Sequence, residues 1–415
     1  MSRWFAVAVG YSVLGAAVAT LPATAGTKAR EEPAKWAPAV KPKPLSEHVQ
    51  RGLAWLVEAQ RKNGGWSQGE ESEHMGHYLD KLRDVPSVAD TCIAAVALIR
   101  AGSTPRSGPH AKNVLAAVNF ACGEIGKSDE KSLFVTDVRG TRVQTKLGNY
   151  IDTFLASLLL AEVKGQMPDA RAEKRLAAAF HKVMDKIERN QRSDGTWDDR
   201  GWAPVLQQSL ASKAINRAAQ AGVSASPQVL QRAERYARDQ FDQKSGKFKG
   251  AGSAGVALYS SAAHLGAMRD SDNTNAVREQ QARVALKTAK TAREREEAKR
   301  TLKRIAENRD DLQKAQSAVV RNLEDKRFVS GFGSNGGEEF LSYMNIGESL
   351  AVKGGPEWLK WDKSITDNLN RIQNNDGSWT GHHCITGRTF CTAAALLVLT
   401  VDRAPVPVAA KIKRQ

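Results

Sequence analysis

Cysteine and aromatic residues are scarce in this sequence of 415 residues. It has 4 cysteines, and Phe, Trp and Tyr together make up 6% of it. Four cysteines are too few for a disulfide scaffold at this length, although single disulfides are expected to form in an exported chain. So few aromatic rings also argue against a cavity lined by them, the kind that stabilises carbocations.

Long apolar runs are absent after the N-terminus. Residues 4–25 carry no charge, and Ala23-Thr24-Ala25 is a small-residue cleavage signal. This pattern predicts a secretory signal peptide over residues 1–25 and a periplasmic or secreted protein. The alternative is an uncleaved segment that anchors the N-terminus in a membrane, because the uncharged stretch is long enough to span one.

A linker and a tail are expected to flank the folded region. Residues 26–45 contain four prolines among charges, which predicts a linker. Residues 402–415 form a basic C-terminal tail. The folded region is therefore expected to span residues 46–401.

Acidic residues are outnumbered, and the formal net charge is +16. The basic residues are spread along the chain without interleaved aromatics, so specific nucleic-acid binding is not predicted. Basic side chains on solvated helix faces explain the excess of positive charge. The alternative is that this charge binds an anionic partner in the cell envelope.

One short motif recurs three times. Gln60 to Trp66 reads QRKNGGW, Gln191 to Trp197 reads QRSDGTW, and Gln373 to Trp379 reads QNNDGSW. Each copy follows an amphipathic helical stretch and precedes one that is rich in Ala, Leu and Ser. Asn-Gly and Asp-Gly turn the chain, the Trp covers the turn, and the Gln bonds to backbone groups that the helix ends leave free.

Twelve helical positions follow from this periodicity. The second member of each pair, such as NYIDTFLASLLLAEV, is apolar nearly all round, which predicts complete burial. The first members are amphipathic. We therefore predict an inner ring of six helices and an outer ring of six. The expected positions are 46–62, 87–101, 110–124, 148–164, 169–191, 203–220, 226–241, 252–267, an interrupted ninth, 337–353, 356–373 and 388–401.

The Q-x-x-[DN]-G-x-W motif resembles the repeat of squalene and other triterpene cyclases and of protein prenyltransferase β subunits. The resemblance implies an all-α fold, an (α/α)6 toroid, over residues 46–401. It says little about activity, because the repeat residues are architectural.

The ninth position is interrupted by residues 270–327, which lack Gly, Pro and aromatic residues and contain 15 Lys or Arg and 11 Asp or Glu. Opposite charges lie at helical spacing beside a thin apolar seam. This predicts a charged helical hairpin that breaks near residues 288–297, and we expect residues 275–325 to be dispensable for the fold. The hairpin is either a solvated decoration or a docking site for a protein partner.

This sequence lacks the residues that carry the activities of the two families that it resembles. Cyclisation by protonation uses a D-x-D-D acid, and the nearest string, Asp270 to Asn273, lacks the last Asp. The prenyltransferase zinc pair would fall at Glu338 and Glu339, where its Cys is missing, and the zinc-binding His would fall near Cys391. Neither activity is expected.

Histidines and cysteines gather after the third motif, where the last outer helix leads into the last inner helix. Cys92 and Cys391 hold matching repeat positions on helices that ring closure makes neighbours. One interpretation is a disulfide, Cys384–Cys391 or Cys92–Cys391, or buried thiols. The others are a zinc or copper site and, with least support, a cysteine nucleophile. The candidate ligand or metal site comprises His382, His383, Cys384, Cys391, Cys92, Glu338 and Glu339.

Two classes of function remain. The first is a non-catalytic toroid that binds a hydrophobic, glycan or protein ligand in the cell envelope, without a cofactor. The second is an enzyme on the same fold, acting on envelope lipids or as a polysaccharide lyase.

Overall fold

The computed structural model describes residues 34–72, 80–198, 200–223, 225–333 and 335–409. The expected signal peptide and the outer parts of the expected linker and tail lie outside these residues. Within them, no helix combines the length and the apolar character needed to cross a membrane.

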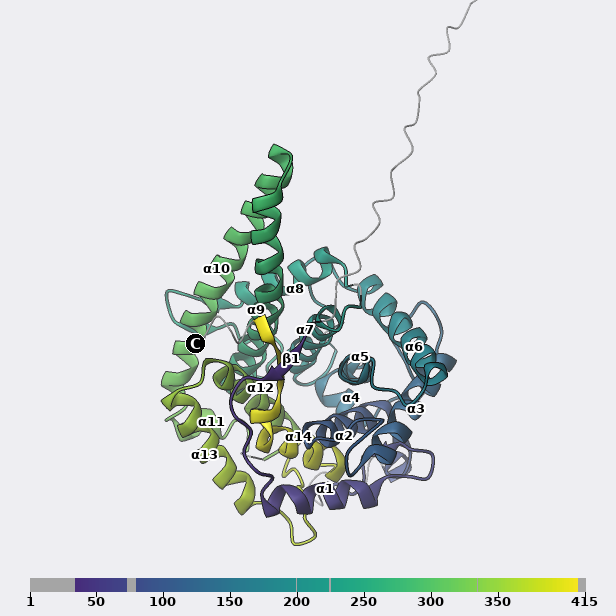
Figure 1. Ribbon diagram of the computed structural model, residues 1–415. Coiled ribbons are helices and arrows are strands. Elements are labelled where there is room, and N and C mark those ends of the chain that lie inside the picture. Colours follow the sequence, from purple (N-terminus) through teal and green to yellow (C-terminus); the bar gives the residue numbers. More distant parts are fainter. Residues whose placement is uncertain (1–33, 73–79, 199, 224, 334, 410–415) are drawn as a thin grey trace, which may run out of the picture. The chain divides into compact units, whose positions relative to one another are not determined.

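The described chain is helical, with strands of only two or three residues (Figure 1). In the part that the structure describes, six helices form an inner ring in which each packs against the next and α14 packs against α2. The inner helices are α2 (Val88–Arg100), α5 (Ile151–Val163), α7 (Pro204–Gln220), α9 (Ala257–Thr288), α12 (Gly337–Lys353) and α14 (Arg388–Leu399). The outer helices are α1 (Glu47–Ala59), α3 (Ala111–Lys127), α6 (Ala170–Arg189), α8 (Pro227–Asp239), α10 (Ala292–Asn322) and α13 (Pro356–Arg371). The predicted all-α (α/α)6 toroid is confirmed.

Burial separates the two rings as the sequence pattern predicts. Every residue of α5 is buried, whereas α6 buries one face that includes Leu176, Phe180 and Val183. Small and apolar side chains let the inner helices approach on all sides, and the charged faces of the outer helices remain in water.

The three repeat tryptophans occupy equivalent positions. Trp66, Trp197 and Trp379 are 0–1% exposed. Their indole Nε1–H groups donate to the carbonyls of Leu56, Ile187 and Leu369 at 2.8, 2.9 and 2.8 Å. Each Trp therefore fixes the last turn of its outer helix and fills the space beneath the connection.

The repeat glutamines do more than the sequence predicted. Gln60, Gln191 and Gln373 donate to their own turns, at the carbonyls of Gly64, Gly195 and Gly377. The same Nε2 groups also donate to the start of the next outer helix, at Asn113, Val229 and His48 respectively. The last of these bonds, 2.8 Å long, joins the end of α13 to α1 and so closes the outer ring.

Glycine is required in these turns. Gly195 has a φ of +94°, and an added Cβ would lie 2.3 Å from the carbonyl oxygen of Arg232. Both the left-handed backbone and the contact with α8 exclude a side chain.

The charged segment folds as α9 and α10, which run side by side (Figure 1). The helices break at residues 289–291, where Thr291 and Glu294 form a capping box. Residues 283–297 are mostly exposed. Leu312, Ala315 and Val319, in contrast, belong to the main hydrophobic core. The second half of α10 takes the ninth position of the double ring, and its core residues argue against the expectation that residues 275–325 are dispensable, which stays a prediction.

Short antiparallel strands join the two ends of the described chain. β1 (Trp36–Pro38) pairs with β6 (Pro405–Pro407), with Trp36 opposite Pro407. The segments expected as linker and tail thus contribute ordered residues, because the backbone groups of β1 and β6 bond to each other and Val406 is buried.

The remaining elements are connections. They are the strand pairs β2 (Trp66–Ser67) with β3 (Pro86–Ser87) and β4 (Phe241–Asp242) with β5 (Lys247–Phe248), the helices α4 (Arg142–Leu147) and α11 (Lys326–Val329), and the 3-10 turns η2 (Asp80–Leu82) and η3 (Val401–Arg403).

Candidate functional site

Four buried carboxyl groups gather where the inner helices begin. Asp90 lies in the first turn of α2, Asp152 in that of α5, and Glu338 and Glu339 in that of α12. The positive end of each helix dipole favours a carboxylate there. Glu338 and Glu339 were proposed from the sequence, whereas Asp90 and Asp152 were missed. The recurrence of Asp at the start of inner helices was the available signal.

Asp90 and Asp152 hold adjacent helices together. The Ser87 hydroxyl donates to Asp90 at 2.6 Å, and the backbone N–H of Ala89 donates to Asp152 at 2.9 Å. Gln144 donates to the other oxygen of Asp152 at 2.8 Å. Burial raises the pKa of Asp90 to about 7, against the lowering effect of Ser87. These bonds cap α2 and tie it to α5, which is a structural role.

Glu339 lies at the centre of a contact network. One of its oxygens accepts from the Tyr259 hydroxyl and from the backbone N–H of Phe332 at 2.9 Å. Its other oxygen is buried and lies 3.3 Å from Nε2 of His383, without hydrogen-bond geometry. The structure therefore brings Glu339 and His383 together, as the sequence grouping proposed.

Glu338 is less completely bonded. The backbone N–H of Ile385 donates to its Oε2 at 3.2 Å, while its buried Oε1 has no hydrogen-bond partner. Burial first, and the neighbouring Glu339 second, raise the pKa of Glu338 to about 8. Glu338 consequently carries a proton at neutral pH.

The loop with His382, His383 and Cys384 packs against the start of α12. The backbone N–H of His382 donates to Asn335 at 2.7 Å. Burial, and then the charge of Glu338, raise the pKa of Cys384 to about 12. A thiol with so high a pKa is a poor nucleophile at neutral pH, which argues against cysteine catalysis here.

Cys92 and Cys391 lie on the neighbouring helices α2 and α14, and both are fully buried. The Cys391 thiol donates to the carbonyl of Ile385 at 3.2 Å. All four cysteines, Cys122 included, are free thiols in the structure. The proposed disulfide among Cys92, Cys384 and Cys391 is thus not present in the structure and stays a prediction for the mature protein. Counting thiols in the denatured, non-reduced protein tests it, since one disulfide leaves two thiols and none leaves four.

Metal binding also stays a prediction. Among the residues that the structure describes, no three His, Cys, Asp or Glu side chains converge as metal ligands.

An aromatic rim, defined by Trp202, Phe332 and His383, lies over the carboxyl pair. The ring centroids of Trp202 and Phe332 are 5.4 Å apart, and those of Phe332 and His383 are 5.0 Å apart. Phe332 is 58% exposed, and the Lys146 ammonium lies 5.4 Å from the Trp202 ring centroid. Trp202 and Phe332 were missed from the sequence, because they sit in loops outside the repeat motif.

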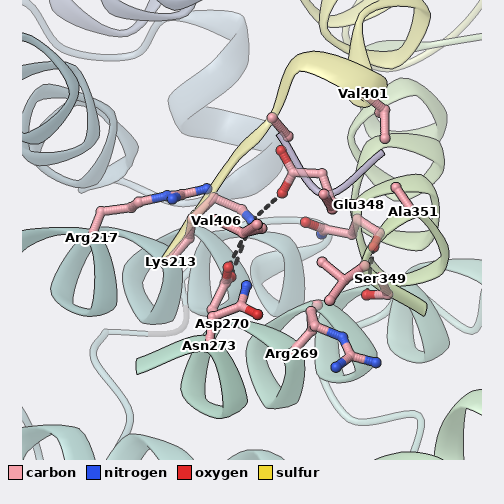
Figure 2. Close-up of a pocket in the computed structure, with 15 residues that line it drawn as sticks. Lys213, Arg217, Arg269, Asp270, Asn273, Glu348, Ser349, Ala351, Val401 and Val406 are labelled. Atoms are coloured by element: carbon pink, nitrogen blue, oxygen red, sulfur yellow. Dashed lines mark hydrogen bonds and ion pairs between the residues drawn. The ribbon is translucent and has the colours of Figure 1, made fainter. Parts of the chain in front are cut away.

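Deeper in the ring, side chains of three successive inner helices, α7, α9 and α12, meet. Lys213 of α7 bonds to Glu348 of α12 at 2.6 Å and to Asp270 of α9 at 3.1 Å (Figure 2). Asn345 of α12 donates to Ser209 of α7 at 3.1 Å. The cavity beside this axial cluster measures about 10 Å³, room for one water molecule.

The axial charges compensate one another. Burial opposes the charge of Lys213, but Asp270 and Glu348 raise its pKa above the ordinary value. Burial would also raise the pKa of Glu348, yet Lys213 and Arg100 bring it down to about 2. The cluster is thus a set of paired ions, which blocks the ring axis at this level.

Comparison with known proteins gives a resemblance in fold only. No protein-family model matches the chain, and a search of curated proteins finds no significant match. A solved structure titled as the type II terpene cyclase MstE from Scytonema (apo) aligns with 86% of this chain and 97% of its own, at 13% identity and a TM-score of 0.43. A structure titled "Glycosidase E178A" aligns with 86% of this chain and 96% of its own, at 12% identity and a TM-score of 0.32.

Proposed function

We propose that this protein is an exported, non-catalytic toroid that binds a glycan of the cell envelope at its aromatic rim. The observation that carries the proposal is the blocked ring axis. Lys213, Asp270 and Glu348, from three inner helices, occupy the interior of the ring with a buried cluster of charged groups. A cyclase or prenyltransferase needs a cavity of several hundred Å³, and the axial cavity here has about 10 Å³.

The rim supplies the chemistry that a sugar needs. The exposed Phe332 ring and the partly exposed Trp202 ring offer apolar faces to the C–H groups of a pyranose. Lys146 lies beside the Trp202 ring, and its ammonium group can donate to hydroxyl groups of the sugar. Export is supported by the signal-peptide pattern of residues 1–25.

The test is co-sedimentation of the purified protein with insoluble envelope polysaccharide. The native protein is expected to sediment, and Trp202→Ala and Phe332→Ala are expected to weaken binding about tenfold each, as for aromatic anchors of a binding site. Leu359→Ala is the matched control, because Leu359 is 64% exposed on α13 and should leave binding unchanged. Equal sedimentation of all four proteins, or of none, contradicts the proposal.

A second candidate is an enzyme that uses the carboxyl pair. The observation that favours it is the protonated Glu338 beside Glu339, since an acid next to a second carboxyl group is a common arrangement for acid–base chemistry. Release of reducing ends or of unsaturated sugars from the same polysaccharide, abolished by Glu338→Gln, would establish this function. Binding without release supports the non-catalytic proposal.

A further inference from the structure

A groove of about 670 Å³ lies between α9 and α10 and reaches Lys353 at the end of α12. It is separate from the aromatic rim, which lies where α12 begins. Its volume is in the range of small-molecule sites. The sequence analysis offered the charged segment as a docking site for a protein, but no pattern in it indicated a small-molecule groove.

Positive charge predominates in the lining of the groove. Arg269, Arg283, Arg309 and Lys353 contribute four cationic groups, against the two carboxylates of Asp272 and Glu279. The carboxylates are bonded within the lining: Arg269 donates to Asp272 at 3.0 Å and Arg309 to Glu279 at 2.7 Å. The groove therefore has a net positive charge.

A buried donor in the same groove lacks an acceptor. Gln316 is 4% exposed, and its carbonyl oxygen accepts from Arg269 at 2.6 Å. Its Nε2 amide group is buried and has no hydrogen-bond partner. A donor in that position is costly unless an acceptor from outside the chain meets it.

Two cations of the lining can turn toward a ligand. The side chains of Arg283 and Lys353 are 65% and 51% exposed. Each bonds to a carboxylate four residues away in the sequence, Arg283 to Glu279 within α9 and Lys353 to Glu357 at the start of α13. The Lys353–Glu357 pair is exposed, and Glu279 keeps its bond to Arg309 when Arg283 turns away, so exchange of these two cations for an anionic ligand costs little.

We propose that this groove binds a small polar molecule through a carboxylate or phosphate group. Arg283 and Lys353 hold the oxyanion by charge-assisted hydrogen bonds, and the Gln316 amide donates to a second acceptor of the same molecule. The inference does not depend on the function proposed for the rim.

The test is isothermal titration of the full protein with glucuronic acid, glucose 6-phosphate and glucose. At least one of the two acids is expected to bind ten times more tightly than glucose, and which one does so identifies the oxyanion. Arg283→Ala and Lys353→Ala should each weaken that binding about tenfold. Lys363→Ala is the matched control, because Lys363 is an exposed lysine on α13 that pairs with Asp367 four residues away.

Two results would overturn the proposal. One is that neither acid binds more tightly than glucose. The other is that Arg283→Ala and Lys353→Ala keep the affinity within twofold of the native protein while circular dichroism shows all variants folded. Failure of the rim to bind polysaccharide leaves this test unaffected.

Discussion

Single side chains secure the connections between the rings. Trp197 and Trp379 combine full burial with a hydrogen bond to the preceding outer helix, so their loss removes both packing and a bonded donor. The carboxyl groups at the start of the inner helices differ from one another: Asp152 is fully bonded, whereas Glu338 keeps an unbonded oxygen and a proton.

Truncation of a repeat tryptophan is expected to be costly. Trp197→Ala or Trp379→Ala should lower the free energy of unfolding by about 3–5 kcal/mol, as for other large buried side chains. Urea denaturation measures the loss. The exposed Leu359→Ala should change stability by less than about 0.5 kcal/mol, and a similarly small change in the tryptophan variants would mean that the clamp is not energetically important.

Replacement of Glu338 should change the pH dependence of stability. The folded pKa of about 8 lies above the ordinary 4.5, so the folded chain keeps a proton that the unfolded chain loses between these values. The contribution of Glu338 to the free energy of unfolding therefore falls as pH rises from 4.5 to 8. Glu338→Gln does not titrate, and its stability relative to the native protein should increase with pH, by up to about 4 kcal/mol at pH 8.

Thermal and urea unfolding of both proteins from pH 5 to pH 9 measures this difference. The two curves should converge near pH 5. Parallel curves across the range would show that Glu338 is already ionised in the folded protein.

At the scale of elements, the hairpin of α9 and α10 has two parts with different roles. Its tip is charged and exposed, whereas Leu312, Ala315 and Val319 pack into the core. The boundary between the exposed tip and the packed part of the hairpin is set by the positions of α10 that contact α8 and α9.

Deletion of the tip is expected to be tolerated. Replacing residues 284–296 with a short Gly/Ser bridge should leave the melting temperature within about 2 °C, because mostly exposed residues are lost. Removing residues 275–325 should instead abolish cooperative unfolding, since the ninth helix of the double ring goes with them. Calorimetry measures the unfolding transition of both deletion variants. If both unfold cooperatively at the native melting temperature, α10 does not contribute to the stability of the double ring.

For the whole molecule, the axial cluster connects helices that are far apart in sequence. Lys213 contacts both Asp270 and Glu348, so that α7, α9 and α12 meet at one buried ammonium group (Figure 2). Such a cluster contributes less to stability than its distances suggest, but removal of one partner leaves the other charges uncompensated.

Removal of the central cation should therefore destabilise the protein. Lys213→Met is expected to cost about 3–5 kcal/mol at pH 7, measured by urea denaturation. The double variant Lys213→Met with Asp270→Asn removes one of the stranded carboxylates and should regain part of the loss. If Lys213→Met alone is as stable as the native protein, water already solvates the carboxylates of the cluster.

The sequence by itself determined the architecture, because the apolar periods, the Gly-containing turns and the buried Trp positions are local and repeat. It also put Glu339 and His383 into one candidate site, Glu339 through the resemblance to the prenyltransferase zinc pair and His383 through the histidines and cysteines after the third motif. Tertiary structure decided the rest. Trp202, Phe332 and His383 meet only when the ring closes, and Lys213 finds its carboxylates 57 and 135 residues away. The packing of α10 could not be predicted from the sequence for the same reason. Its apolar seam is thin, and the burial of that seam depends on neighbouring helices that a local pattern does not contain.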